Sequence, residues 1–267
     1  MRPRACGRSI GALLASALLF ALSHAPPARA GEPGCPAGHI DRRAHVAHVY
    51  DGDTVRLDDG TRVRFIGINT PELAHDGNPE EPFARAARQA LVALLDGSHQ
   101  RLALRHGRER HDHYGRLLAH IYLPDGRSIE RILLARGLGI RITIPPNTRD
   151  WRCLSRAESG ARDARRGIWS LARYRGMPTT ALPADPGGFR VITGDVREVN
   201  ESRHAWWLEL DRLALRLPKD DLPYFEGLDP AELAGRRLRA RGWVYEVHGE
   251  ARMNLDHPAN VEWLDGD

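Results

Sequence analysis

The sequence predicts a mainly β fold with added α-helices, in which a small barrel of strands carries helices packed outside it and a second β-rich part follows. Segments with strand-like alternation surround segments with helical spacing, and turn-forming residues bound most of them. A stretch rich in proline and glycine at residues 171–188 lacks apolar periodicity and is typical of a connection. We therefore expect two domains.

The first part begins with a predicted hairpin. Residues 45–57 alternate as one strand, residues 58–60 form a turn, and residues 62–68 return with β-branched and aromatic side chains. The elements expected after it are a helix at 82–95, strands at 101–105 and 117–123, and helices at 128–136 and 149–166. In this order, the strands can close a small barrel with the helices packed outside it.

Residues 1–30 have the features of a secretory signal peptide. Three arginines precede an apolar run at residues 10–22, and Ala28-Arg29-Ala30 offers a cleavage site with small residues. The run is shorter than the roughly 18 to 20 apolar residues that a membrane-spanning helix needs. We therefore expect a periplasmic or secreted protein with no stable membrane span after cleavage. An uncleaved membrane anchor is the alternative.

Removal of this leader would take away Cys6 and leave Cys35 and Cys153. An even pair of cysteines in an exported chain predicts a disulfide. Closing so long a loop would stabilise the fold by up to about 4.7 kcal/mol in the chain-entropy model. Two unpaired buried thiols are the alternative.

The net charge of +4 is mostly a property of the leader, which holds four of the 39 basic residues and no acid. The charge of the remaining chain is unevenly distributed. Residues 41–170 contain 22 arginines and 17 acids, whereas the chain from residue 171 contains 13 basic and 17 acidic residues. The first block can attract a polyanion, and the second gains no such support.

The strongest functional signal is a series of short motifs between residues 51 and 116. The motifs are Asp51-Gly-Asp53-Thr54, Arg64, Asn69-Thr70-Pro-Glu72 and Asp112-His-Tyr114-Gly-Arg116. Hydrolysis of a phosphodiester requires neutralisation of charge on the phosphate oxygens, activation of a water and protonation of the leaving oxygen. A hard cation held by carboxylates, guanidinium groups and one general base would meet these needs. The motifs therefore predict a phosphodiesterase site, provided that the fold brings them to one face.

On these motifs, their order and the closing Gly167-Ile-Trp-Ser170, residues 45–170 resemble the staphylococcal nuclease (thermonuclease) family. The resemblance implies a five-stranded oligonucleotide-binding (OB) barrel with three helices, and an endonuclease that uses Ca²⁺ to cleave DNA and RNA to 3′-phosphate products. Residues 189–264 resemble a second small OB-like β-barrel, without a sharp motif. The expected divisions are a signal peptide at 1–30, an N-terminal extension at 31–44, the thermonuclease-like domain at 45–170, a linker at 171–188 and the OB-like domain at 189–264.

The same resemblance implies a metal site. Position by position, it makes Asp53 a calcium ligand and places Asn69 and the backbone carbonyl of Thr70 beside it. Asp51 would support the ligands from behind.

The resemblance also implies the catalytic groups. Glu72 would be the base that activates or orients water, Arg64 and Arg116 would hold the scissile phosphate, and Tyr114 would touch a neighbouring phosphate. A planar guanidinium suits phosphate because it binds two oxygens at once and stays charged.

Two departures from the family pattern bear on these expectations. The family usually has an aspartate at the position of Asn69, and an amide removes one negative charge from the metal site, so we expect weaker calcium binding or a different metal. Near residues 142–146 the family's best-known members have tyrosines that pack on the nucleotide, whereas Thr143 and Pro145 offer no comparable ring face.

Each candidate also has a structural interpretation. Asp51 and Asp53 can shape a turn, Arg64 and Arg116 can form ion pairs or support a hairpin, and Glu72 can cap the next segment. The rival to a nuclease is therefore a nucleic-acid or protein binding module that keeps the barrel without cleavage. Retention of both arginines and the glutamate favours the nuclease.

Other residue groups support different functions less well. His111-Asp-His113 suggests a transition-metal site, against which stands a solvated loop. Trp206, Trp207 and Trp243 can stack on bases, although core or interface positions fit better in an acidic segment.

Overall fold

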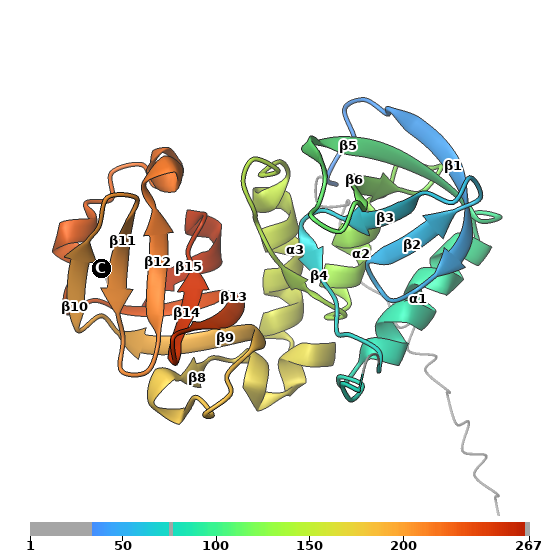
Figure 1. The fold of residues 1–267 in the computed structure, drawn as a ribbon. Coiled ribbons are helices and arrows are strands. Elements are labelled where there is room, and N and C mark those ends of the chain that lie inside the picture. The colour runs from blue at the N-terminus through green and yellow to red at the C-terminus, as the bar shows by residue number, and fades with distance from the viewer. Residues whose placement is uncertain (1–33, 75–76, 265–267) are drawn as a thin grey trace, which may run out of the picture. The chain divides into compact units, whose positions relative to one another are not determined.

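The N-terminal part of the chain forms a closed barrel in the strand order β1-β2-β3-β6-β5 (Figure 1). Its strands are β1 (Arg42–Val49), β2 (Thr54–Leu57), β3 (Arg62–Phe65), β5 (Arg101–His111) and β6 (Leu117–Tyr122). The computed structural model describes residues 34–74 and 77–264. The predicted signal peptide lies outside these described residues.

A parallel pairing closes the ring of otherwise antiparallel neighbours. β3 runs parallel to β6, with Val63 opposite Leu117 and Arg64 opposite Leu118. Val55, Val63 and Leu104 on different strands are fully buried, which shows that one side of the strands supplies the barrel core. The predicted fold class, mainly β with α and a barrel at its centre, is confirmed.

The strand expected over residues 45–57 is broken in two by a turn between β1 and β2. Burial does not alternate across residues 50–53, where Gly52 and Asp53 are both buried, and the backbone bends there. Gly52 has space for nothing larger, since an added Cβ would lie 2.8 Å from side-chain carbons of both Thr70 and Ala87. Two distant segments therefore pack directly on this turn.

Three helices expected from the sequence lie in this part of the described chain: α1 (Ala84–Asp96), α2 (Ile129–Ala135) and α3 (Trp151–Asp163). α1 buries Ala87, Leu91 and Leu95 against the barrel core, which is the face that the helical spacing predicted. A short antiparallel pair joins β4 (Ile68–Asn69) to β7 (Ile140–Arg141). None of the described helices is long and apolar enough to cross a membrane.

The C-terminal part is a further, eight-stranded sheet in the order β10-β11-β12-β14-β13-β9-β8, with β15 paired to β13. Its strands are β8 (Met177–Pro178), β9 (Gly188–Asp195), β10 (Glu198–Glu201), β11 (Ala205–Glu209), β12 (Ala214–Pro218), β13 (Arg237–Val247), β14 (Glu250–Asn254) and β15 (Val261–Trp263). The order is open between β10 and β8 within the described residues. β8 lies inside the predicted linker and pairs with β9.

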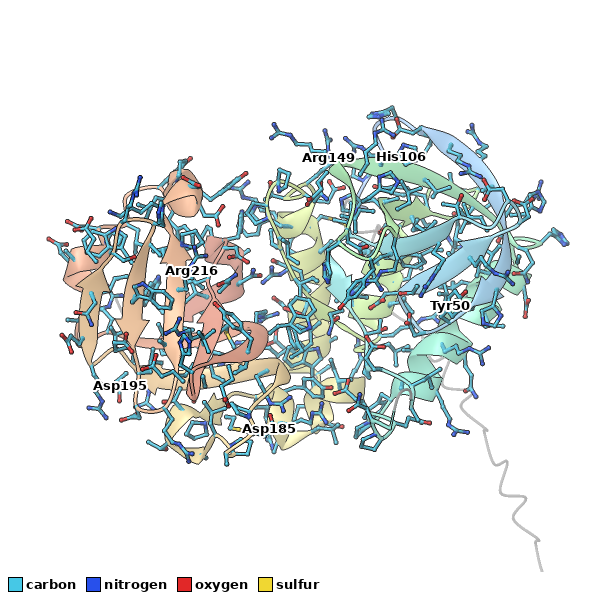
Figure 2. All side chains as sticks on the ribbon, viewed as in Figure 1. Tyr50, His106, Arg149, Asp185, Asp195 and Arg216 are labelled. Atoms are coloured by element: carbon cyan, nitrogen blue, oxygen red, sulfur yellow. A yellow bond between two sulfur atoms is a disulfide. The ribbon has the colours of Figure 1, made fainter. Side chains whose placement is uncertain are left out.

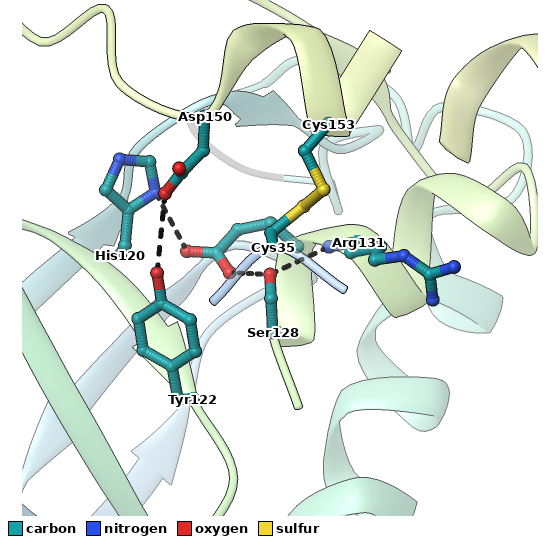
Figure 3. Close-up of a disulfide and its surroundings, with 8 residues drawn as sticks. Cys35, His120, Tyr122, Ser128, Arg131, Asp150 and Cys153 are labelled. Carbon is teal, nitrogen blue, oxygen red and sulfur yellow. Dashed lines mark hydrogen bonds and ion pairs between the residues drawn. A yellow bond between two sulfur atoms is a disulfide. The ribbon is translucent and has the colours of Figure 1, made fainter. Parts of the chain in front are cut away.

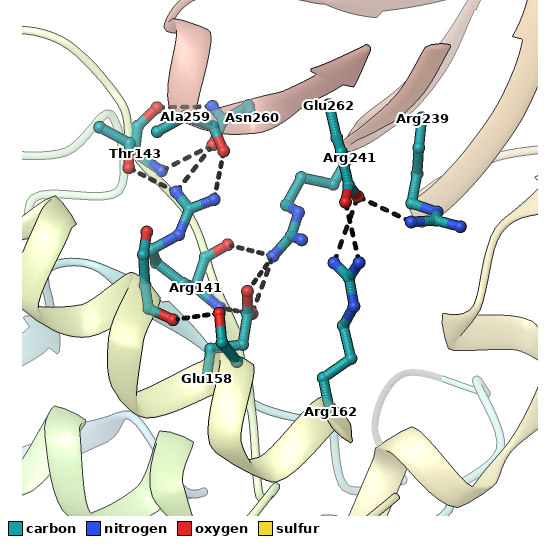
Figure 4. Close-up of polar contacts among 11 residues, drawn as sticks. Arg141, Thr143, Glu158, Arg162, Arg239, Arg241, Ala259, Asn260 and Glu262 are labelled. Atoms are coloured by element: carbon teal, nitrogen blue, oxygen red, sulfur yellow. Dashed lines mark hydrogen bonds and ion pairs between the residues drawn. The ribbon is translucent and has the colours of Figure 1, made fainter. Parts of the chain in front are cut away.

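Polar contacts link α3 and β7 to β13 and the segment before β15 (Figure 4). Nη1 of Arg241 on β13 lies 2.6 Å from Oε2 of Glu158 on α3, and both side chains are buried. Asn260 accepts the backbone N–H of Thr143 and donates to its carbonyl, at 3.1 and 2.7 Å. The C-terminal sheet is therefore joined to the nuclease-like part by buried, directional contacts.

A disulfide joins Cys35 to Cys153 on α3, as predicted (Figure 3). The two residues are 118 positions apart, so the bond ties the start of the described chain to the third helix. Cys35 is buried in the barrel core.

Reduction of this disulfide should lower the free energy of unfolding by about 2–5 kcal/mol, because the reduced unfolded chain gains the entropy of a long loop. Urea unfolding of the oxidised protein and of the same protein in reductant measures the difference. Equal midpoints would show that the bond does not restrict the unfolded chain.

A buried carboxyl group lies near the disulfide, at the start of α2. Glu130 accepts the backbone N–H of Ile121 at 2.7 Å and the hydroxyl of Ser128 at 2.8 Å. Nδ1 of the buried His120 lies 3.7 Å from Oε1 of Glu130. Burial raises the pKa of Glu130 to about 8 and lowers the pKa of His120 to about 3, so both groups are neutral in the folded protein near pH 6.

The raised pKa of Glu130 should make stability fall as pH rises. The folded state holds the proton more tightly than the unfolded state, so this contribution is complete below about pH 4.5 and is lost by about pH 8. His120 has the opposite sign, because its contribution is lost as pH falls below about 6.5. We therefore expect Glu130→Gln to become more stable relative to wild type between pH 5 and 8, as measured by urea unfolding at each pH. A constant difference would contradict the raised pKa.

Candidate active site

The turn between β1 and β2 carries the two acids of the first motif. Oδ1 of Asp51 accepts the backbone N–H of Asp53 at 2.8 Å, which fixes the turn. Tyr50, the residue immediately before this turn, is labelled in Figure 2. Asp51 therefore shapes the turn between β1 and β2, as its structural interpretation predicted.

The carboxylate of Asp53 is only 1% exposed and is surrounded by donors. Its Oδ2 accepts the backbone N–H and the hydroxyl of Thr70, at 2.7 and 3.0 Å. Its Oδ1 accepts the hydroxyl of Thr54 at 3.1 Å and lies 3.2 Å from Nε of Arg64. These bonds bring the first, second and third motifs to one place.

Arg64 uses every nitrogen of its guanidinium inside the protein. Nη1 donates to the carbonyls of Phe65 and Ile68, both at 2.8 Å, and Nη2 donates to Oδ1 of Asn69 at 3.0 Å. Nε faces Asp53. The side chain therefore holds β3, β4 and the acidic turn together, and it occupies the oxygens of two expected metal ligands.

Negative charge accumulates around Asp51. Its pKa is raised to about 8, mainly by burial and then by the charge of Asp53, with a further contribution from Glu72, while Arg64 acts in the opposite direction. Carboxyl groups that raise one another's pKa are stabilised by an added cation. Glu72 is thereby placed within electrostatic reach of Asp51.

Two hydrogen bonds hold the backbone of Glu72 to Glu81. The N–H of Glu72 donates to Oε2 of Glu81 at 3.1 Å, and the N–H of Glu81 donates to the carbonyl of Glu72 at 2.9 Å. Oε1 of Glu81 in turn accepts Nη2 of Arg173 at 2.5 Å. Neither Glu81 nor Arg173 was a candidate from the sequence, because no motif surrounds them.

Arg116 and Tyr114 lie on the turn that precedes β6. Nε of Arg116 lies 2.7 Å from Oδ2 of Asp112, and the guanidinium lies 5.2 Å from the ring centre of Tyr114. Arg116 immediately precedes Leu117, the residue of β6 that pairs with Val63 on β3. The contacts of Arg116 thus run to its own turn, whereas those of Arg64 run to the acidic turn. Tyr114 is 71% exposed and accessible to a ligand.

The donor set fits a hard cation in its chemistry. Asp53, the amide oxygen of Asn69 and the carbonyl of Thr70 offer oxygen ligands, which is what Ca²⁺ prefers. Burial, followed by the charges of Asp53 and Glu72, raises the pKa of Asp51, and a bound cation would act in the opposite direction. Arg64 already supplies one positive charge to the same oxygens, so a cation would have to compete with it.

The other candidates are placed as follows. His111 and His113 are exposed, with the ring centre of His113 lying 3.8 Å from that of Tyr114, and no group of three or more histidine, cysteine or acidic residues suited to a metal occurs in the described part of the chain. Trp206 packs against the core of the C-terminal sheet, Trp207 faces Arg252 at 4.8 Å, and Trp243 is 43% exposed.

Comparisons with known proteins agree with this geometry. Residues 62–171 match the family described as staphylococcal nuclease homologue. The thermonuclease of Staphylococcus intermedius is 36% identical over 128 residues, which are 46% of this chain and 74% of that protein. The SPbeta prophage-derived endonuclease YokF of Bacillus subtilis is 31% identical over 46% of this chain and 43% of its own length. The endonuclease YhcR of the same species is 28% identical over 78% of this chain but only 18% of its own length.

The barrel, its acidic turn and these relatives define an enzyme class, a nuclease that hydrolyses phosphodiester bonds. The chain belongs to the staphylococcal nuclease homologue family.

Replacement of Arg64 should destabilise the fold, because Asp53 would remain buried without its counter-charge. We expect Arg64→Met to lower the free energy of unfolding by about 3 kcal/mol. The control is Arg62→Met on the same strand, where the side chain is exposed. Urea unfolding of both variants at pH 7 compares them, and equal losses would contradict a structural role for the Arg64 contacts.

Proposed function

We propose that the protein is an exported, Ca²⁺-dependent endonuclease that hydrolyses DNA and RNA and leaves 3′-phosphate ends. The observation that carries the proposal is the convergence of Asp51, Asp53, Arg64, Asn69 and Glu72 at one end of the barrel. Export is supported by the sequence of residues 1–30 and by the disulfide, a bond that persists in oxidising compartments.

Each residue of the site has a role in the proposed hydrolysis. Glu72 accepts a proton from the attacking water, and Arg116 binds the non-bridging oxygens of the scissile phosphate. Asp53, the amide oxygen of Asn69 and the carbonyl of Thr70 would hold the cation. When bound, the cation supplies positive charge that offsets the charge developing on the phosphate.

Arg64 can serve either the metal ligands or the phosphate. Its guanidinium now donates to Asp53 and Asn69, which are the oxygens that a cation would use. A cation that takes these oxygens would release part of the guanidinium toward the phosphate, where the resemblance places its catalytic role. Cation binding and phosphate binding by Arg64 would then favour each other.

The same contacts favour a second candidate, a nucleic-acid binding module without cleavage. If Arg64 permanently replaces the cation at Asp53 and Asn69, the barrel could still bind a phosphate backbone through Arg116 and the exposed Tyr114.

Glu72→Gln tests the proposal directly. The variant cannot accept a proton, so we expect the cleavage rate to fall by about 10²- to 10⁴-fold with little change in binding. Rates are measured on single-stranded and duplex DNA and on RNA, with Ca²⁺ and with chelator. Glu198→Gln, an exposed acid on β10, is the control. Tight binding without products for wild type in Ca²⁺ would support the binding module instead.

Asn69→Asp tests the metal site. The restored carboxylate adds one negative charge, so we expect Ca²⁺ affinity to rise by about tenfold or more. Isothermal titration calorimetry without nucleic acid measures it, and Asn78→Asp on the exposed segment after Glu72 is the matched control. Equal affinity in wild type and Asn69→Asp would show that Asn69 does not contact the cation.

A further inference from the structure

We propose that Glu81 and Arg173 are positioning residues that hold Glu72 in its working place, so that the segment following the barrel takes part in catalysis. The inference rests on the proposed role of Glu72 as the base. Arg173 lies on the short 3₁₀ helix Ala172–Tyr174, beyond the residues that match the family.

Glu72 needs such support because it lies outside every helix and strand. Glu81 contacts its backbone from both sides, as donor to the carbonyl at 2.9 Å and as acceptor from the N–H at 3.1 Å. The second of these bonds requires one orientation of the Glu81 side chain. Arg173 selects that orientation, because it holds the other carboxylate oxygen at 2.5 Å.

The pair of Glu81 and Arg173 contributes little to stability by itself. The side chains are 31% and 38% exposed, and ion pairs with such exposure are worth less than about 1 kcal/mol. The contribution that we infer is to the position of Glu72 and not to the free energy of unfolding. A shift of about 1 Å in a catalytic group can cost about 100-fold in rate, far more than the ion pair adds to folding.

Apolar packing fixes both ends of this connection. Tyr174 is buried next to Arg173, in a cluster with Val191 of β9, and Phe83 packs against the same cluster two residues after Glu81. Phe83 has a left-handed backbone with φ of 73°, which costs a non-glycine residue about 1–2 kcal/mol. The packing of its ring offsets this strain, so the position of Glu81 is tied to the first strand after the predicted linker.

The cavity beside this cluster shows how close the connection comes to the metal ligands. Its lining includes Asn69 and Thr70 together with Glu81, Arg173 and Tyr174. A change in the segment after the barrel can therefore reach the site through direct contact.

The first test compares the steady-state rates of single variants on an oligonucleotide at saturating Ca²⁺. We expect Arg173→Gln to lower kcat by about 3- to 10-fold with KM within twofold, and Arg173→Lys to restore most of the rate. Arg175→Gln is the control, because it makes the same change at an exposed arginine of the same segment. A rise in KM alone would overturn the proposal in favour of direct phosphate binding by Arg173.

The second test repeats Arg173→Gln in the Glu72→Gln background under single-turnover conditions. If Arg173 acts through Glu72, the second change should have no further effect on the residual rate. Multiplying effects would overturn the proposal. A wild-type rate for Glu72→Gln alone would instead refute the role of Glu72 as the base, and this inference with it.

A third measurement is independent of activity. Hydrogen exchange of the Glu72 amide, followed by NMR, should be faster in Glu81→Ala and Arg173→Gln than in wild type and Arg175→Gln. Unchanged protection would show that these side chains do not hold the Glu72 backbone.

Discussion

The burial of the Asp53 carboxylate is the constraint on which the site depends. A charged group taken out of water costs several kcal/mol unless donors replace its hydration. Thr54, Thr70 and Arg64 supply those donors, and they come from β2, from the segment after β4 and from β3. An arrangement without these donors would leave a buried charge with no partner. The buried carboxylate therefore favours the fold in which the acidic turn, the guanidinium of Arg64 and the strand leading to Glu72 meet.

The parts of the fold that depend on local sequence patterns could be predicted from the sequence. Helical spacing predicted α1 within two residues, and contacts join Asp53 to Arg64 and Thr70 within the structure. The turn between β1 and β2 was expected only as a structural role of Asp51 and Asp53, because the close approach of Thr70 and Ala87 to Gly52 leaves no trace in the local sequence. Such an approach exists only in three dimensions.

Other features depend on contacts between residues that are distant in the sequence, and these contacts produce no local sequence pattern. β14 carries a single fully buried side chain, Met253, so its five residues show no clear alternation. The contact between Glu81 and Arg173 spans 92 positions and involves two common charged residues with no motif around them. The disulfide could be predicted because, once Cys6 is set aside with the predicted leader, Cys35 and Cys153 leave one pairing.

The disulfide also bears on how the fold would respond to proteolysis. The bond and the buried Arg241–Glu158 pair both hold α3, the first to the start of the described chain and the second to the C-terminal sheet. A protease that cuts an exposed loop between these anchors would leave the fragments connected. The chain would therefore separate into pieces only after several cuts or after reduction of the disulfide.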